Sequence, residues 1–541
     1  MSDMKNPMYA TSRMFLQLLK RDWIKLVAWV LGMVAFAISG LSKMELLGQD
    51  TTQLKAMVSM FQNPAMIALA GPLPPNSSQL SVGAIFGQSM TLLTAVLFAI
   101  VSIIYVVNRT RKEEDEGTLE LIRSFKVGKL ANTTAVMFVL LLVHLLTTFA
   151  IAGVLEVQHV PSMHAFSDNL MFAGAVSLQG ILWGVIALVF AQINPEAGGA
   201  KGFSFALLGL LYVVRIPTDI SNLHLSWLNP LSWSYLAFPY VENNILPFVL
   251  TIVLIGILLV LAYRLELSRD MGAGYLPEGK GHNHARKSLL SYPGLLLHLE
   301  KTTIISWSVG FLLFGAIYGS LFGKMDEFLN SNATVKQIFA IGSAGKYSLQ
   351  EQFMSTIFVI MAVIVVCFAV VGLNKTISEE KRGRQEQLYA TPLTRTKIYW
   401  THALLSIGMG FLGLFVSGIG LYFAQRGSSA NTIPLGEVLQ SALIGLPGIV
   451  FILSILGLLV GFLPRFTSII WIYIGFVFFD VYVGSLISLP DWVGKLNIFG
   501  YLPRLPIDAM NWSNVLIILS ISLVLFVGGY VSYLKRDMIQ G

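Results

Sequence analysis

Long apolar runs alternate with short polar segments along the whole chain. An α-helix needs about 20 apolar residues to cross the hydrocarbon core of a bilayer, because its backbone polar groups must be satisfied within the segment. Twelve runs approach that length, so the pattern predicts an all-α integral membrane protein with about twelve transmembrane helices. The predicted spans are residues 24–41, 84–107, 133–154, 169–192, 202–218, 245–264, 302–322, 352–373, 399–424, 437–463, 467–488 and 513–534.

Composition agrees with this pattern and excludes several classes of protein. Hydrophobic residues make up 55% of the chain and charged residues only 12%, with a mean hydropathy of +0.71. Soluble domains carry about 25% charged residues, so a soluble enzyme is excluded. The single Cys367 cannot form an internal disulfide, and no Cys or His cluster has the spacing of metal ligands, so we expect no metal site.

The distribution of basic residues predicts the orientation. With the N-terminus on the cytoplasmic side, 27 of the 36 Lys and Arg residues fall in cytoplasmic segments. This excess follows the positive-inside rule. We therefore expect a multi-pass protein of the bacterial plasma membrane with both termini in the cytoplasm.

The sequence also repeats itself. Residues 108–120 and 374–386 share six of thirteen positions at an offset of 266, and Arg269-Asp270-Met271 recurs at 536–538 at an offset of 267. Six spans per half is an even number, so the halves are predicted to be parallel repeats. The predicted domains are a first six-span half (1–271), a cytoplasmic linker (272–296) and a second six-span half (297–541).

The loop after the second span of each half carries the repeated pattern Glu-Glu-x-x-Gly-x-x-Glu. A solvated loop whose basic residues set the topology is the simplest interpretation of one such loop. Its duplication favours a function, because topology requires Lys and Arg but not Glu at fixed places. The repeated positions are Glu113, Glu114, Gly117 and Glu120 in the first half and Glu379, Glu380, Gly383 and Glu386 in the second.

With six spans per half and this loop, the chain resembles the ABC-2 type permeases of ATP-binding-cassette exporters, in the duplicated form found in bacterial exporters of polyketide antibiotics and drugs. The resemblance implies that each loop is a coupling helix that docks on an ATPase subunit through the eight repeated positions. It also implies two copies of a separate ABC ATPase, which would bind ATP and Mg. Residues 14–24 resemble the family's elbow helix, and a polar start of the first span is the alternative.

No ATP-binding site is present in the chain, so we expect a transporter subunit that is not an enzyme and holds no cofactor itself. A phosphate-binding loop requires Gly-x-x-x-x-Gly-Lys-Ser/Thr, and the nearest segment, Gly342–Tyr347, lacks that spacing. An ion-gradient-driven secondary transporter is the alternative. It would need ionisable groups inside the spans, where His144, Arg215 and Asp480 are the candidates.

Arg215 and Asp480 lie at similar depths in spans five and eleven, so we hypothesise that they pair. The alternative is that both side chains reach the outer interface. Mildly polar groups in the spans are candidates for a substrate path, and small polar side chains in helix packing are the alternative. The candidate path residues are Gln88, His144, Gln179, Arg215, Gln440 and Asp480.

Together these features predict the permease subunit of an exporter. Its expected cargo is a hydrophobic or amphipathic compound such as an antibiotic, a drug or a lipid-like molecule, because the spans are rich in Leu, Phe, Met and Trp. The expected partners are the ATPase subunits and membrane lipids, and no nucleic acid.

Overall fold

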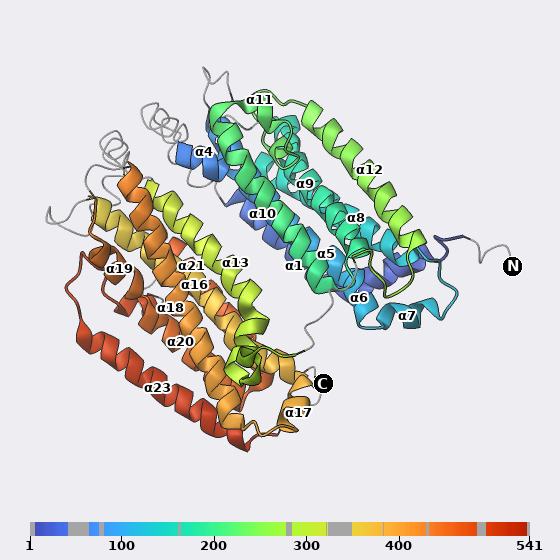
Figure 1. Cartoon of the computed structure of the whole chain (residues 1–541). Helices are drawn as coiled ribbons and strands as arrows, with labels where there is room; N and C mark the ends of the chain where they lie inside the picture. The colour runs from blue at the N-terminus through green and yellow to red at the C-terminus, as the bar shows by residue number, and fades with distance from the viewer. Residues whose placement is uncertain are drawn as a thin grey trace. The chain divides into compact units, whose positions relative to one another are not determined.

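The described parts of the computed structural model consist of helices and the segments that connect them, with no strand among them (Figure 1). The described residues are 6–39, 41, 64–74, 81–158, 160, 163, 165–276, 284–320, 322, 349–381, 383–428, 432–483 and 494–537. Ten of the described helical segments are long and apolar enough to cross a membrane. The chain folds into two compact units, unit 1 (Met1–Gly281) and unit 2 (His282–Gly541), and the division falls within the predicted linker 272–296.

Unit 1 is a bundle of long helices with short helices at both ends. Its described helices are α1 (Thr11–Ile38), α4 (Pro64–Ala70), α5 (Val82–Arg109), α6 (Arg111–Asp115), α7 (Thr118–Arg123), α8 (Ala131–Val157), α9 (Phe166–Ile193), α10 (Ala197–Ser221), α11 (Leu223–Ser226), the 3-10 helix η3 (Ser232–Ser234) and α12 (Leu246–Ser268).

Unit 2 is also a bundle of long helices joined by shorter ones, and its long helix α16 continues through the repeated Glu-Glu pair, where unit 1 has the separate helix α6. Its described helices are η4 (Lys287–Leu290), α13 (Tyr292–Ser320), α16 (Leu349–Lys381), α17 (Arg384–Tyr389), α18 (Arg395–Ser428), α19 (Leu435–Leu443), α20 (Leu446–Phe462), η5 (Pro464–Phe466), α21 (Ile469–Val483), η6 (Ile498–Tyr501) and α23 (Trp512–Lys535).

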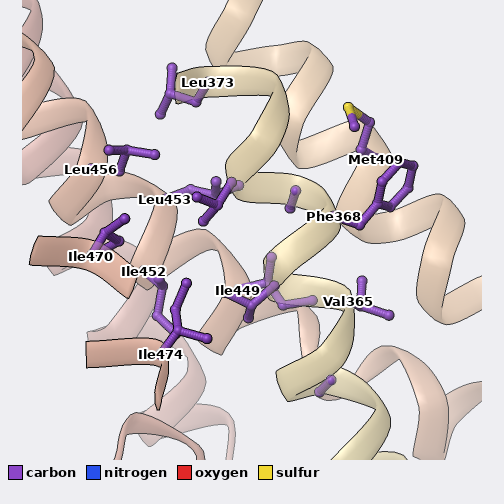
Figure 2. Packing of buried hydrophobic residues seen from close by; sticks show 14 of the residues in the cluster. Val365, Phe368, Leu373, Met409, Ile449, Ile452, Leu453, Leu456, Ile470 and Ile474 are labelled. Carbon is purple, nitrogen blue, oxygen red and sulfur yellow. The ribbon is translucent and has the colours of Figure 1, made fainter. Parts of the chain in front are cut away.

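Each unit has a hydrophobic core of its own. In unit 2, α16 lies at the centre of a cluster that includes Phe368 and is completed by Ile449 and Leu453 of α20 and Ile474 of α21 (Figure 2). In unit 1, Ala99 of α5 and Trp183 of α9 belong to a corresponding cluster. The residues that fix the helices of a unit against one another therefore come from within that unit.

Glycines allow the closest helix crossings in unit 2. A Cβ on Gly315 of α13 would lie 2.1 Å from the carbonyl oxygen of Ser417 in α18, and one on Gly461 of α20 would lie 2.0 Å from that of Gly529 in α23. Backbones this close exclude any side chain, which is how small residues hold membrane helices together.

Ten of the twelve predicted spans coincide with apolar helical segments of spanning length among the described residues. The first predicted span, 24–41, overlaps the end of α1, which runs unbroken from Thr11 to Ile38 and is too charged at its start to count among the ten. The continuous helix supports a polar start of the first span over a separate elbow helix at 14–24. The eleventh predicted span, 467–488, is described only as the shorter helix α21. Residues 342–347 lie outside the described part of the chain.

Candidate functional site

The two repeated loops have the same turn. After the Glu-Glu pair the chain reverses at Gly117 and Gly383, whose φ angles are +73° and +68°. Only glycine adopts this left-handed conformation without strain. A six-residue helix follows in each case, α7 in unit 1 and α17 in unit 2. We call the end of each unit that carries this loop its charged end: residues 109–129 with the end of α12 in unit 1, and 375–395 with the end of α23 in unit 2 (Figure 1).

A first buried ion pair recurs at both charged ends. In unit 1 the guanidinium of Arg109, the last residue of α5, binds the carboxylate of Asp22 in α1. In unit 2 the ammonium of Lys375 in α16 binds the carboxylate of Glu300 in α13. Both carboxylates are almost fully buried. The second long helix of each unit is therefore tied to the first by charge.

A second ion pair ties the loop to the last helix. The two carboxylate oxygens of Glu114 accept hydrogen bonds of 2.6 Å each from Arg269, the residue that ends α12. Those of Glu380 accept bonds of 2.6 and 2.5 Å from Arg536, which ends α23 in the same way. Two parallel bonds between guanidinium and carboxylate make the strongest and most directional of side-chain ion pairs.

A third recurrent contact caps the last helix. The Lys129 ammonium donates to the carbonyl oxygens of Leu267 and Arg269 at 2.9 Å. The Arg395 guanidinium donates to the corresponding carbonyls of Leu534 and Arg536, at 3.3 and 2.6 Å. A cation at the carboxyl end of a helix satisfies free carbonyl groups and interacts favourably with the helix dipole.

Unit 1 adds contacts that unit 2 lacks at the matching positions. Arg111 is 1% exposed, and its guanidinium donates to the carbonyl oxygens of Pro195, Gly272 and Ala273. The matching residue in unit 2 is the apolar Ile377. The loop of unit 1 is therefore fixed on more sides than the loop of unit 2.

The eight predicted coupling residues divide into two groups. Glu113, Glu114 and Glu380 are buried and Glu379 is half-buried. Besides the arginines described above, Arg21 binds Glu113 and Arg384 binds Glu379, so arginines occupy most of the oxygens of these four side chains. The remaining four lie beyond the turn or in it, where Glu120, Gly383 and Glu386 are exposed and Gly117 is half-exposed. The first group holds the loop in place, and only the second group faces outward.

Large apolar side chains are exposed on α7 and just after it. Leu121 of α7 is 69% exposed and Phe125, two residues past its end, is 74% exposed, whereas Leu119 of α7 is buried. The matching positions in unit 2 are Gln387 and Thr391, which are polar and at least partly exposed. The two loops therefore share a framework but present different surfaces.

Two predicted path residues hold α4 in place. The Arg215 guanidinium donates to the carbonyl oxygens of Ile67 and Ala68, and the Gln88 amide donates to that of Gly71 at 2.7 Å. Buried donors used in this way fix a segment of backbone.

Arg215 also forms an ion pair that the sequence did not suggest. Its guanidinium lies 2.8 Å from the Asp219 carboxylate, one helical turn further along α10, and both side chains are completely buried. Tyr235 and Ser226 donate to the same carboxylate at 2.7 and 2.5 Å. Burial, together with the charge of Asp219, raises the pKa of the Tyr235 phenol, so it remains a hydrogen-bond donor.

This network removes the reason for pairing Arg215 with Asp480. Arg215 is already neutralised within its own helix, and its side chain is buried, so it does not extend to an interface as the alternative required. The Asp480 carboxylate accepts a 2.8 Å hydrogen bond from the Asn497 amide within unit 2.

Each of the other three path candidates has its own surroundings. The His144 ring is 1% exposed and its Nε2 lies 2.8 Å from the Ser102 hydroxyl. The Gln179 amide donates to the carbonyl of Pro230 at 2.9 Å, and Gln440 is exposed in unit 2. Within unit 1 the structure therefore brings Gln88 and Arg215 together at α4, whereas His144 and Gln179 take part in other contacts.

Sequence reasoning missed the partners at the charged ends. It used Arg269 and Arg536 as evidence of repetition, and it counted Arg109 and Lys375 only as topology signals. Asp22 and Glu300 are separated by 278 residues, which is the offset that relates Trp29 and Gly32 to Trp307 and Gly310. The bases Arg109 and Lys375 are likewise separated by the repeat offset of 266. An acid and a base that both recur at repeat offsets could have identified these pairs from the sequence.

Comparison with known proteins gives two matches. Residues 289–533 match the family model described as the C-terminal domain of the multidrug efflux system permease Rv1217c. Over 529 residues the chain is 28% identical to the multidrug efflux system permease protein Rv1217c of Mycobacterium tuberculosis, with 96% of this chain and 94% of the relative covered. The chain is thus similar to an efflux permease along nearly its whole length.

Proposed function

We propose that this chain is the membrane permease of an ABC-2 type exporter that moves hydrophobic or amphipathic compounds out of a bacterial cell. The observation that carries the proposal is the end-to-end similarity to a multidrug efflux permease. Ten apolar helical segments of spanning length among the described residues support a multi-pass membrane protein. The proposed location is the plasma membrane with both termini in the cytoplasm, and the distribution of Lys and Arg along the sequence is the reason for this orientation.

We propose further that the chain has twelve spans arranged as two parallel repeats. The support lies in the contacts that recur between corresponding residues: Asp22–Arg109 with Glu300–Lys375, and Glu114–Arg269 with Glu380–Arg536. Duplicated partners in both units are difficult to explain without duplication of the fold itself.

ATP hydrolysis in this proposal is performed by two copies of a separate ABC ATPase that dock on the charged ends. The buried glutamates hold each loop, and the docking surfaces are the outward faces of α7 and α17. Leu121 and Phe125 would supply apolar anchors on α7, because exposed apolar side chains beside charged ones are typical of protein contacts.

An ion-gradient-driven transporter is less well supported. Such a transporter needs ionisable groups in the spans that exchange an ion during transport. Arg215 is neutralised by Asp219, and the His144 ring is packed so closely that a Cβ on Gly180 would lie 2.2 Å from its Cε1. Such contacts are typical of side chains that stabilise the fold, in contrast to side chains that exchange an ion.

Reconstitution tests the source of energy. The purified permease is placed in liposomes alone, or together with the ABC ATPase encoded nearest its gene, and transport of the dye ethidium is followed by fluorescence. We expect transport only with both proteins and ATP, and none when the ATPase carries a disabled ATP site. Transport by the permease alone on a proton gradient would identify a secondary transporter and contradict the proposal.

A further inference from the structure

A cavity of about 240 Å³ lies at the charged end of unit 1, between α1 and the junction of α5 with α6. Measured in the same way, a single water molecule needs only about 10–15 Å³, so the cavity has room for a polar group of several atoms. Its lining comes from one face of α1, from the end of α5 and from the loop as far as Thr118.

The lining changes from aromatic to charged along the helices. Asp22 of α1 binds Arg109, the last residue of α5. About two turns further along α1, the Trp29 ring meets that of Tyr105, one turn earlier in α5, edge to face with centroids 5.4 Å apart. The two helices therefore run in opposite directions here, and the aromatic wall lies deeper in the bundle than the charged rim. Such a cavity suits an amphipathic ligand.

The acids of the lining are already paired. Asp22 and Glu113 are buried, and each carboxylate is bound to an arginine of the lining. The third acid, Glu116, is exposed and lies 3.6 Å from the Lys112 ammonium. A ligand that enters the cavity therefore meets no unpaired carboxylate.

The bases provide the accessible charge. The side chains of Arg21 and Lys112 are 40% and 39% exposed. Lys25 is exposed as well, and it takes part in no ion pair or hydrogen bond among the described residues. Four bases and three acids line the cavity, which leaves a net charge of +1. This charge attracts an anion.

Two uncharged N–H groups are accessible beside these bases. The Asn108 side-chain oxygen accepts a 2.6 Å hydrogen bond from Lys201, but the Asn108 amide nitrogen donates to no group in the described part of the chain. The same is true of the Trp29 indole nitrogen. Neither nitrogen is among the buried atoms that lack a partner, so each keeps surface that a ligand can reach. These groups only donate, so the ligand must supply acceptors, as the oxygen atoms of a phosphate do.

The surroundings of Lys25 point to a lipid. Trp23, Ile24 and Val27 flank it on α1, and each of them is at least half exposed. Bases and tryptophan beside exposed apolar residues are typical of the level at which lipid headgroups lie. A soluble anion would use the rim alone, whereas a lipid would also cover this apolar surface.

We propose that this cavity binds the phosphodiester of an anionic phospholipid of the phosphatidylglycerol class. Lys25, Asn108 and Trp29 donate to the oxygen atoms of the lipid, and its acyl chains lie along the exposed apolar residues of α1. One negative charge neutralises the lining, and a headgroup without a cation avoids repulsion by the bases. The inference rests on the proposed location in a membrane and is independent of how transport is powered.

Unit 2 lacks most of these bases. At the repeat offsets of 278 and 266, the counterparts of Arg21, Lys25 and Lys112 are Leu299, Thr303 and Ser378. Three of the four lining bases are thus replaced by uncharged residues, although Trp29 has a counterpart in Trp307. We therefore expect the site in unit 1, with one such lipid per chain.

Short-chain lipids test the inference with the full-length permease in detergent. Dihexanoyl phosphatidylglycerol and dihexanoyl phosphatidylcholine have the same acyl chains and the same phosphodiester, but the second also carries a cation. Binding is measured by native mass spectrometry and by thermophoresis. We expect the glycerol lipid to bind at least about tenfold tighter at low salt, and the ratio to fall as salt is added, because salt screens exposed charges. Glycerol 3-phosphate, which has no apolar part, should bind much more weakly.

A matched pair of variants locates the binding. Lys25→Gln should weaken binding of the glycerol lipid about tenfold, as expected for the loss of one charge-assisted hydrogen bond. Lys20→Gln is the control, because Lys20 is exposed on the same helix but lies outside the cavity lining. Both variants change the net charge equally, and both should keep the unfolding temperature because the two side chains are exposed.

Three results would overturn the assignment. Equal binding of the two lipids would show that the bases do not select an anionic headgroup. An equal effect of Lys25→Gln and Lys20→Gln would show that binding does not occur in this cavity. Binding of glycerol 3-phosphate as tight as that of the lipid would identify a site for a soluble phosphate instead. None of these measurements involves ATP or an ATPase, so their outcome is separate from that of the transport experiment.

Discussion

Glu114 and Glu380 were predicted to dock on a partner, but in the structure each holds its own loop in place. Their spacing suggested contacts with a partner, but each carboxylate is held by two hydrogen bonds from the arginine that ends the last helix of its unit. Removing one member of a buried ion pair leaves the other charge without compensation, which costs more than the pair contributes.

Glu114→Gln is therefore expected to destabilise the protein. The expected loss is about 3 kcal/mol, since the Arg269 guanidinium stays buried without a counter-charge. Thermal unfolding in detergent, followed by circular dichroism, measures the change. Glu120→Gln is the matched control, because Glu120 is exposed in the same loop and should leave the unfolding temperature unchanged.

A double substitution distinguishes the ion pair from a general sensitivity of the loop. Glu114→Met combined with Arg269→Met removes both charges and should recover much of the stability lost in the single variant. If the double variant is as unstable as the sum of the single ones, the pair is not the cause.

At the residue scale, the sequence identifies residues that share a structural role in the two halves, but it does not reveal which contacts they make. The offset of 266 located the glutamates and glycines of the loops, because a repeat preserves residues that share a structural role. It did not reveal that Asp219 neutralises Arg215, because Asp219 was assigned to the segment after the span. That error came from ending the helix at 218, whereas α10 continues through Pro217 to Ser221.

At the scale of helices, the length of the apolar runs predicted where the helices lie along the chain, but it did not predict where they end. Most helices extend beyond the predicted apolar run, as α16 does when it reaches Lys381, eight residues past the predicted end at 373. The backbone of a membrane helix stays helical after its side chains become polar, so hydropathy marks the hydrocarbon core and not the helix end. The tenth predicted span consists of two helices, α19 and α20, with a break at Ile444 and Gly445.

The difference between α7 and α17 leads to a prediction about coupling. Leu121→Asp places a charge on the exposed apolar face of α7, and it should reduce ATP-driven transport at least about tenfold if that face anchors an ATPase. Gln387→Asp, at the matching position of unit 2, replaces a residue that is already polar and should have a much smaller effect.

Both variants are reconstituted with the ATPase, and ethidium transport is compared with ATP hydrolysis. Leu121 is exposed, so its substitution should leave the unfolding temperature unchanged. Equal effects of the two substitutions would mean that the apolar face of α7 is not the anchor.

At the scale of the whole molecule, each unit contains both partners of its own ion pairs and its own core. Cleavage between the units should therefore leave both folded. A protease site inserted between residues 276 and 284 should be cleaved in the reconstituted protein with less than about a twofold loss of transport. Gel analysis measures the cleavage, and transport is measured on the same sample. Loss of the fold of either unit after cleavage would contradict this.

The sequence predicts a linker from its repetition and from a change in composition. The boundary between the two compact units falls at 281–282, inside the polar stretch that the sequence marked as a linker. Pairings between distant residues were not predictable in the same way, because hydropathy carries no information about which helices are neighbours. The pair between residues 22 and 109 became apparent only when α1 was found beside the end of α5.

Among the described residues, every ion pair that joins two different helices lies at a charged end. Helices that separate there must break ion pairs between helices. At the opposite end of unit 1 the contacts described include hydrogen bonds from Arg215 to the backbone of α4, but no ion pair between two helices. A displacement of either loop would therefore act directly on the last helix of its unit, because the buried glutamate of the loop is bound to the arginine at the end of that helix.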